Sequence, residues 1–148
     1  MLKLHNTYSN TVEEFKPNSD SVKIYLCGPT VQSSPHIGHG RSAVVFDFLI
    51  RYLVYLDYEV NFVRNITDIE DKIIERAAEE GITTEELADR VTKEFQDAYK
   101  SLNCLPPDNE PKATETIDHI INFIEILIEN GYAYVTQSVV YFEVTNFK

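Results

Sequence analysis

The sequence is poor in cysteine, in long apolar runs and in positive charge. Its 148 residues include two cysteines, Cys27 and Cys104, too few for a disulfide framework and typical of a reduced, cytoplasmic protein. No apolar run approaches the roughly 20 residues that a membrane-spanning helix needs. The start of the chain also lacks the charged-then-apolar layout of a signal peptide. These scarcities exclude a disulfide scaffold, and we expect no membrane partner.

The deficit of positive charge lies in the second part of the chain. Residues 1–60 hold five Lys or Arg and six Asp or Glu, whereas residues 61–148 hold eight and eighteen, and the net charge is −11. Because phosphate backbones are bound by Lys and Arg, the chain is a poor general nucleic-acid binder. Any RNA partner must be held mainly by surfaces that this sequence lacks. The near-neutral first part suits an anionic small molecule better.

What remains has the composition of one globular domain, with 43% hydrophobic and 25% charged residues. The first part predicts a strand over residues 22–26 and a second strand over 60–63. Between them, Ser34-Pro35 predicts an N-cap, and the apolar spacing predicts a helix to about residue 56. Strand, helix and strand form a βαβ unit, with parallel strands and a right-handed crossover.

The second part predicts helices and a small β piece. Capping-box spacing at Thr67 and Glu70 predicts a helix to residue 81, and the same spacing at Thr83 and Glu86 predicts another to about residue 102. A third, amphipathic helix ends near residue 130, before a hairpin over residues 132–144. A two-stranded parallel sheet needs more strands and cover on both faces. We therefore expect an N-terminal piece of something longer, or a chain that pairs with another.

The segment that indicates chemistry is His36-Ile37-Gly38-His39-Gly40-Arg41, which follows a strand and opens a helix. Two glycines in a first helical turn each cost roughly 0.5–1 kcal/mol, which the close approach of a flat ligand would offset. Free N–H groups and the positive end of the helix dipole favour a phosphate there. Two histidines one turn apart can donate to oxygens that gain charge as pyrophosphate leaves. Open α/β sheets bind nucleotides at this position.

Cys27 lies at the end of the first strand, where it is either an inert buried thiol or a metal ligand. No second Cys or His stands at ligand spacing, and Cys104 falls between a helix and a loop. A closed tetrahedral zinc site cannot be assembled from this chain alone.

Three motifs in order resemble the N-terminal part of the cysteinyl-tRNA synthetases, which are class I enzymes. They are Cys27-Gly28-Pro29-Thr30, the histidine segment His36 to Arg41, and the run Arg64-Asn65-Ile66-Thr67-Asp68-Ile69-Glu70-Asp71-Lys72-Ile73-Ile74. The resemblance implies an α/β fold. Residues 1–68 would form the first half of a Rossmann-type (HUP-like) parallel-sheet catalytic domain. Residues 69–148 would form a helical segment and the start of a connective insertion.

The resemblance also implies an activity. The family forms cysteinyl-adenylate from L-cysteine and ATP, here taken as its Mg²⁺ complex, and transfers cysteine to tRNA(Cys). The remaining zinc ligands and the lysine-rich loop that grips pyrophosphate would lie beyond Lys148. We therefore expect this chain alone to be inactive and its longer parent to be the ligase, cytoplasmic and monomeric.

The resemblance assigns roles residue by residue. Cys27 matches the first of four ligands to a Zn²⁺ ion that takes the substrate thiolate, and zinc selects a soft thiolate over a serine hydroxyl. The pocket for cysteine and its adenylate is implied at Gly28, Pro29 and Thr30. His36 and His39 are implied as the catalytic pair at the ATP phosphates, with Gly38 against the adenine. Ser42, Asn65 and Thr67 match positions near the adenylate. The chain has Gln32-Ser33 where many members have Tyr-Asp.

Three other interpretations remain open at the level of sequence. A cysteine ligase of mycothiol biosynthesis shares the first two motifs, although the run from Asn65 to Ile74 favours the synthetase. A small nucleotidyltransferase also uses the two-histidine motif, but this chain has no later Ser/Thr and Arg motif for phosphates. A truncated paralogue that only binds a nucleotide or a partner is the third. Elsewhere, Asp47 and Arg51 predict a surface pair, and His119 is predicted to face solvent.

Overall fold

The computed structural model describes residues 2–17, 19 and 21–147, and it contains three small sheets and four α-helices in these residues. The N-terminal sheet is an antiparallel hairpin of β1 (Lys3–Asn6) and β2 (Thr11–Glu14). The central sheet pairs β3 (Ser21–Leu26) with β4 (Glu59–Arg64) in parallel, joined by α1 (Ile37–Tyr55). The βαβ unit and its parallel strands are therefore confirmed, and the hand of the crossover stays a prediction.

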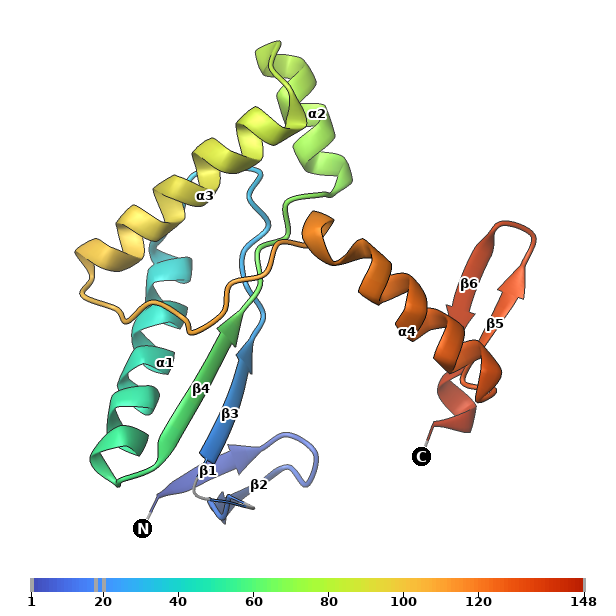
Figure 1. The fold of residues 1–148 in the computed structure, drawn as a ribbon. Coiled ribbons are helices and arrows are strands. Elements are labelled where there is room, and N and C mark those ends of the chain that lie inside the picture. The colour runs from blue at the N-terminus through green and yellow to red at the C-terminus, as the bar shows by residue number, and fades with distance from the viewer. Residues whose placement is uncertain (1, 18, 20, 148) are drawn as a thin grey trace.

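After β4 the chain forms two helices beyond the end of this sheet, and the segment that follows them lies again beside β4 (Figure 1). Helices α2 (Asp71–Glu80) and α3 (Thr84–Ser101) pack against one another at a wide angle beyond the carboxyl ends of β3 and β4. Helix α4 (Ile117–Glu129) then leads outward to the antiparallel hairpin of β5 (Ala133–Thr136) and β6 (Val139–Phe142). Short 3₁₀ turns lie at Thr114–Thr116 and Val144–Asn146. The order of helices and the final hairpin are confirmed.

The predicted start of α1 was wrong. Ser34 does not cap the helix; His36 is the N-cap, with an extended backbone and a side chain that accepts from the Gly38 amide. His39 completes a capping box by accepting from the His36 amide at 3.2 Å. The proline before His36 favours an extended, non-helical approach, so the helix begins two residues later than the Ser-Pro signal predicts.

The predicted start of α2 was also wrong, because Thr67 is occupied elsewhere. Its backbone forms a parallel bridge with Thr30, donating to the Pro29 carbonyl and accepting from the Val31 amide. Glu70 is the N-cap of α2 instead, accepting from the Lys72 amide at 2.9 Å. The Thr83–Glu86 capping box of α3 is confirmed, as is the end of α2 at Gly81, which adopts a left-handed backbone.

A further pairing lies beside β4 and was not predicted. Segment 108–113 runs parallel to the end of β4, where the Arg64 amide donates to the Asn109 carbonyl and the Ile66 amide donates to the Pro111 carbonyl. The Asp47–Arg51 pair, predicted as a surface pair, does more than that. Asp47 accepts from the Leu105 amide, and Arg51 donates to the Asn103 carbonyl. Both features fasten the loop after α3 to the βαβ unit.

The core lies between α1, α2 and α3 and the loops that follow the central strands. Its buried members are Val31, Ala43, Ile66, Ile73, Ala77, Leu87, Ala88, Val91, Phe95 and Tyr99. The two halves of the chain thus share one core around the carboxyl edge of the sheet. Among the described residues, no helix has both the length and the apolar character required to cross a bilayer.

Candidate functional site

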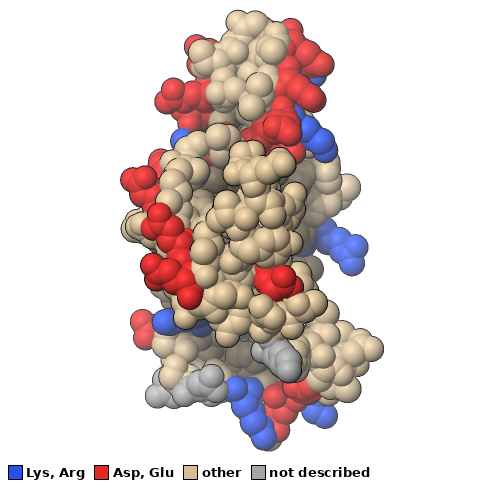
Figure 2. Space-filling view, turned by 90° about the vertical axis from the view of Figure 1, so that its right-hand side faces the viewer, with Lys and Arg blue, Asp and Glu red and all other residues tan. Residues whose placement is uncertain are grey.

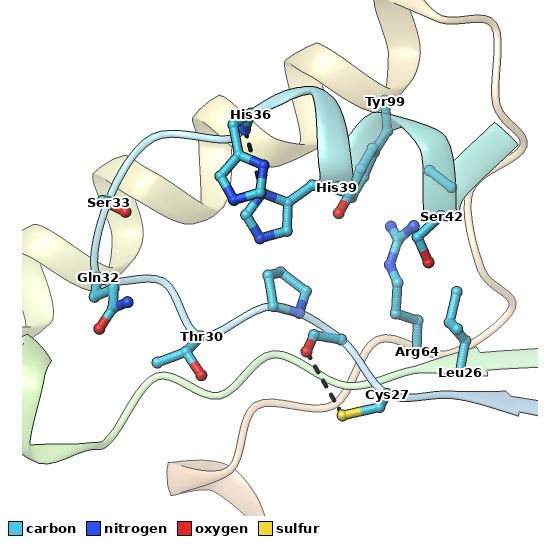
Figure 3. A pocket seen from close by; sticks show the side chains of 13 residues that line it. Leu26, Cys27, Thr30, Gln32, Ser33, His36, His39, Ser42, Arg64 and Tyr99 are labelled. Atoms are coloured by element: carbon cyan, nitrogen blue, oxygen red, sulfur yellow. Dashed lines mark hydrogen bonds between the residues drawn. The ribbon is translucent and has the colours of Figure 1, made fainter.

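A cavity of about 320 Å³ opens at the carboxyl end of β3, between the loop that follows this strand and the start of α1. Figure 3 shows its wall, with the loop on one side and the two imidazoles of α1 on the other. The residues that line it are Leu26, Cys27, Gly28, Pro29, Thr30, Gln32, Ser33, His36, His39, Ser42, Ala43, Arg64 and Tyr99. Seven of the ten site residues predicted from the sequence meet here, while Gly38, Asn65 and Thr67 are not among the lining residues.

The two histidines are oriented by the helix end that they cap. The Gly38 amide donates to His36 Nδ1 at 3.1 Å, and the His36 amide donates to His39 Nδ1 at 3.2 Å. The rings lie 3.9 Å apart between centroids. Because each Nδ1 is an acceptor, the neutral rings carry their proton on Nε2, and both imidazoles keep an Nε2–H donor for another partner.

His39 is held in its neutral form by its surroundings. Burial lowers the pKa of His39 below its usual value, and the neighbouring His36 lowers it further. The ring packs edge-on against Phe95 of α3, with centroids 4.8 Å apart. At neutral pH the site therefore presents His39 as a hydrogen-bond donor rather than as a cation.

At Gly38 and Gly40, neighbouring side chains of the protein leave little space for a Cβ atom. A Cβ on Gly38 would stand 2.9 Å from Cε1 of the His36 ring, and a Cβ on Gly40 would stand 3.1 Å from Leu102 Cδ1. The imidazole cap and the contact with the end of α3 thus account for both residues. The approach of a flat ligand, which the sequence suggested as the reason, is not required to explain them.

The loop wall is fixed by a clamp around Gly28. A Cβ there would overlap the Asn65 carbonyl oxygen, 1.5 Å away, so no other residue fits. The Gly28 amide donates to Asn65 Oδ1 at 2.8 Å, and Asn65 Nδ2 donates to Thr67 Oγ1 at 3.1 Å. Asn65 and Thr67 therefore position the loop from behind, and their side-chain groups are engaged in doing so.

Cys27 lies on the loop side of the cavity, across from the imidazoles (Figure 3). Its thiol is exposed, and among the described residues it makes only a weak hydrogen bond, to the Gly28 carbonyl at 3.8 Å. No group of three or more His, Cys, Asp or Glu residues that could hold a metal occurs in the described part of the chain. These residues supply one soft ligand at most, so they do not form a zinc site by themselves.

Six of the lining residues had no site role predicted from the sequence, and two of them, Arg64 and Tyr99, meet at one side of the cavity. Arg64 ends β4 and Tyr99 lies near the end of α3, and the guanidinium carbon stands 4.3 Å from the centre of the tyrosine ring. Arg64 belongs to a motif that the sequence did identify, but nothing local marks Tyr99. Its place in the site follows only from the packing of α3 across the βαβ unit.

Comparison with known proteins shows the family to which a chain with this site belongs. The sequence model of the family described as tRNA synthetases class I (C) catalytic domain matches residues 14–148. The cysteine–tRNA ligase of Rickettsia bellii is 54% identical over 144 residues, which are 95% of this chain and 31% of that protein. That of Methanococcus vannielii is 48% identical over 149 residues, covering 100% of this chain and 31% of the relative. The chain thus spans about a third of the length of these curated relatives.

Solved structures agree on the fold. A Mycobacterium tuberculosis methionyl-tRNA synthetase in complex with methionyl-adenylate superposes with a TM-score of 0.66 and 24% identity, over 76% of this chain and 23% of that one. A second structure of that synthetase, bound by methionyl-adenylate, gives 0.67 and the same identity. At this level of identity the likeness shows a Rossmann-like α/β fold, as the sequence predicted, and nothing about the substrate.

Proposed function

Because the chain belongs to the family of class I (C) tRNA synthetase catalytic domains, we propose that it carries the ATP- and cysteine-binding part of a cysteine–tRNA ligase. One observation carries this proposal. The imidazoles of His36 and His39 accept at Nδ1 from the capped end of α1 and line the cavity at the carboxyl end of β3, so each offers an Nε2–H donor there. Such a donor set suits the phosphates of a nucleotide.

The reaction that follows from this donor set is the activation of an amino acid. A carboxylate oxygen of cysteine attacks the α-phosphorus of ATP, and a new oxygen–phosphorus bond forms. The bond from the α-phosphorus to the bridging oxygen breaks, and pyrophosphate leaves with the electron pair. The Nε2–H groups of His36 and His39 donate to oxygens that gain charge in this step. No proton moves to or from either ring.

The remaining residues take supporting places in the same proposal. Gly28, Pro29 and Thr30 form the wall for cysteine and its adenylate, and Ser42 borders the cavity from α1. Gly38 seats the His36 ring, while Asn65 and Thr67 hold the wall in place. Cys27 would be the single ligand from this chain to a zinc ion, and Mg²⁺ would accompany ATP. Residues 1–68 would be the Rossmann half and 69–148 the start of an insertion.

Transfer to tRNA would depend on surfaces outside this chain. The second part is strongly acidic, and the face in Figure 2 carries more Asp and Glu than Lys and Arg. Such a surface repels a phosphate backbone. We accordingly propose the ligase activity, the cytoplasmic setting and the monomeric state for a protein as long as the relatives, and not for this chain alone. We expect the 148-residue chain alone to show no cysteine-dependent exchange of pyrophosphate into ATP, and robust exchange would refute this part of the proposal.

A chimera tests the function itself. This chain replaces the matching segment of the Rickettsia bellii ligase, and ATP–pyrophosphate exchange is measured with cysteine, serine and methionine. We expect exchange with cysteine alone. His36→Ala in the chimera should lower kcat by about 10²–10³-fold, since it removes one donor to the developing charge. A folded chimera that is inactive, or that prefers another amino acid, would contradict the proposal.

A further inference from the structure

Arg64 and Tyr99 meet on the side of the cavity next to His39 and Ser42. Both side chains line the cavity, yet Arg64 is only 5% exposed and Tyr99 only 8%. Figure 3 shows Arg64 reaching up from β4 and Tyr99 reaching down from α3, beside Ser42 and beyond His39. Two polar side chains that are largely buried thus approach one another at the wall of the cavity.

The Arg64 guanidinium is fixed from behind. Its Nε and Nη2 both donate to Oε1 of Glu110, at 3.1 and 2.6 Å. The other carboxylate oxygen of Glu110 accepts from Gln96 Nε2 at 2.9 Å, which ties the pair to α3. In the part of the chain that the structure describes, Nη1 of Arg64 has no hydrogen-bond partner. A buried guanidinium normally uses its donors, so a preoriented nitrogen that remains free is notable.

Tyr99 presents a second donor. Its ring lies against the guanidinium and against Phe95, whose centroid is 5.8 Å away, so the ring has little freedom. Its hydroxyl makes no hydrogen bond to any described residue. Burial raises the pKa of Tyr99, and the hydroxyl therefore keeps its proton at neutral pH. This side of the cavity thus offers two oriented donors, with the Ser42 hydroxyl beside them.

We propose that the Tyr99 hydroxyl and Arg64 Nη1 bind the carboxylate oxygen of the amino-acid substrate, and the acyl oxygen that replaces it in the adenylate. This inference rests on the proposed function and adds two binding residues to it. Glu110 and Gln96 act as positioning residues, because they hold Arg64 and touch no ligand themselves.

Charge and place favour the acyl group over a phosphate. The imidazole donors for phosphate come from His36 and His39, whereas Arg64 and Tyr99 line the cavity beside Ser42, about one turn further along α1. Glu110 already neutralises Arg64, so the pair offers hydrogen bonds without a full net charge. Donors without net charge suit the carboxylate oxygen, which loses its charge when the carboxylate becomes an acyl phosphate. They suit a dianionic phosphate less well.

Calorimetric titration of the chain with two probes tests the inference. One probe is cysteinyl-sulfamoyl adenosine, which carries the acyl group, and the other is sulfamoyl adenosine, which lacks it. We expect Tyr99→Phe to weaken binding of the first probe roughly threefold to tenfold, which is the worth of one neutral hydrogen bond, and to leave the second unchanged. The variant keeps the ring that packs on Arg64. Tyr134→Phe, in the exposed hairpin, should change neither titration.

The outcomes separate the two claims. If the unaltered chain binds neither probe, the proposed function fails and the inference fails with it. If it binds both and Tyr99→Phe leaves both affinities unchanged, or weakens both equally, the function stands and the assignment of Tyr99 to the acyl oxygen is wrong. Arg64→Lys gives a second measurement, since it keeps the charge beside Glu110 but lacks Nη1. It should also discriminate between the probes, and equal weakening would overturn the role of Arg64.

Discussion

Helices α3 and α4 are both amphipathic, but the apolar face of α3 is packed against other elements and that of α4 is largely exposed. Helix α3 buries Leu87, Ala88, Val91, Thr92, Phe95 and Tyr99 against α1, α2 and the strand ends. Helix α4 buries no residue, and its apolar side chains at 120, 121, 123 and 126 are between 42% and 60% exposed. Figure 2 looks at the side of α4 and its hairpin and shows a wide area with few charged side chains.

This contrast shows what local sequence signals can and cannot indicate. The Thr83–Glu86 capping box predicted α3 and the apolar spacing predicted α4, because both signals are local. They did not tell which helix would bring a residue into the cavity, because that depends on what the helix packs against. Helix α3 supplies Phe95 to the His39 ring and Tyr99 to the cavity, while α4 supplies nothing to either.

The largest expected effect comes from truncating matched residues on the two helices. Leu87→Ala removes a side chain that is 1% exposed, and it should lower the free energy of unfolding by about 2–5 kcal/mol. Ile121→Ala removes one that is 48% exposed and should cost less than about 1 kcal/mol. Urea unfolding followed by circular dichroism measures both. Equal losses would show that α4 is as well covered as α3.

Two glycines extend the same comparison to the loops. Gly28→Ala places a methyl group onto the Asn65 carbonyl and should cost about 1–3 kcal/mol or more, with loss of nucleotide binding. Gly131→Ala, after α4, meets no neighbouring atom within 4 Å. It strains only a positive φ of 74°, so it should cost about 1 kcal/mol and leave binding intact. Unfolding curves and ATP titration of both variants check this. Retained binding in Gly28→Ala would contradict the clamp.

The smallest expected effect is on the pH dependence of stability. The folded state lowers the pKa of His39, so unfolding takes up protons, and stability should fall as pH drops from about 7.5 to about 5. His39→Asn keeps an acceptor for the His36 amide without titrating, and it should flatten this slope. His119→Asn, on exposed α4, should leave the slope unchanged. A slope that survives His39→Asn would place its origin elsewhere.

Particular residues show how much of this the sequence could predict. The Thr83–Glu86 capping box formed as predicted because nothing competes for either side chain. The predictions for Ser34 and Thr67 failed because an extended segment and a parallel bridge already use that backbone. The histidine motif predicted His36 and His39 in the cavity, and the resemblance to the synthetases implied Cys27, Gly28, Pro29, Thr30 and Ser42 there. Tyr99, Glu110 and the pairing of residues 108–113 with β4 are contacts between distant segments, which no local pattern encodes.

We propose that ATP binds at the capped start of α1, and the four histidines of the chain test this proposal. Their ring ¹H–¹⁵N signals can be followed by NMR during a titration with ATP. We predict that the Nε2 signals of His36 and His39 shift together and saturate, while those of His5 and His119 remain in place. Unchanged signals of His36 and His39 at saturating ATP, or equal shifts of all four, would contradict the account.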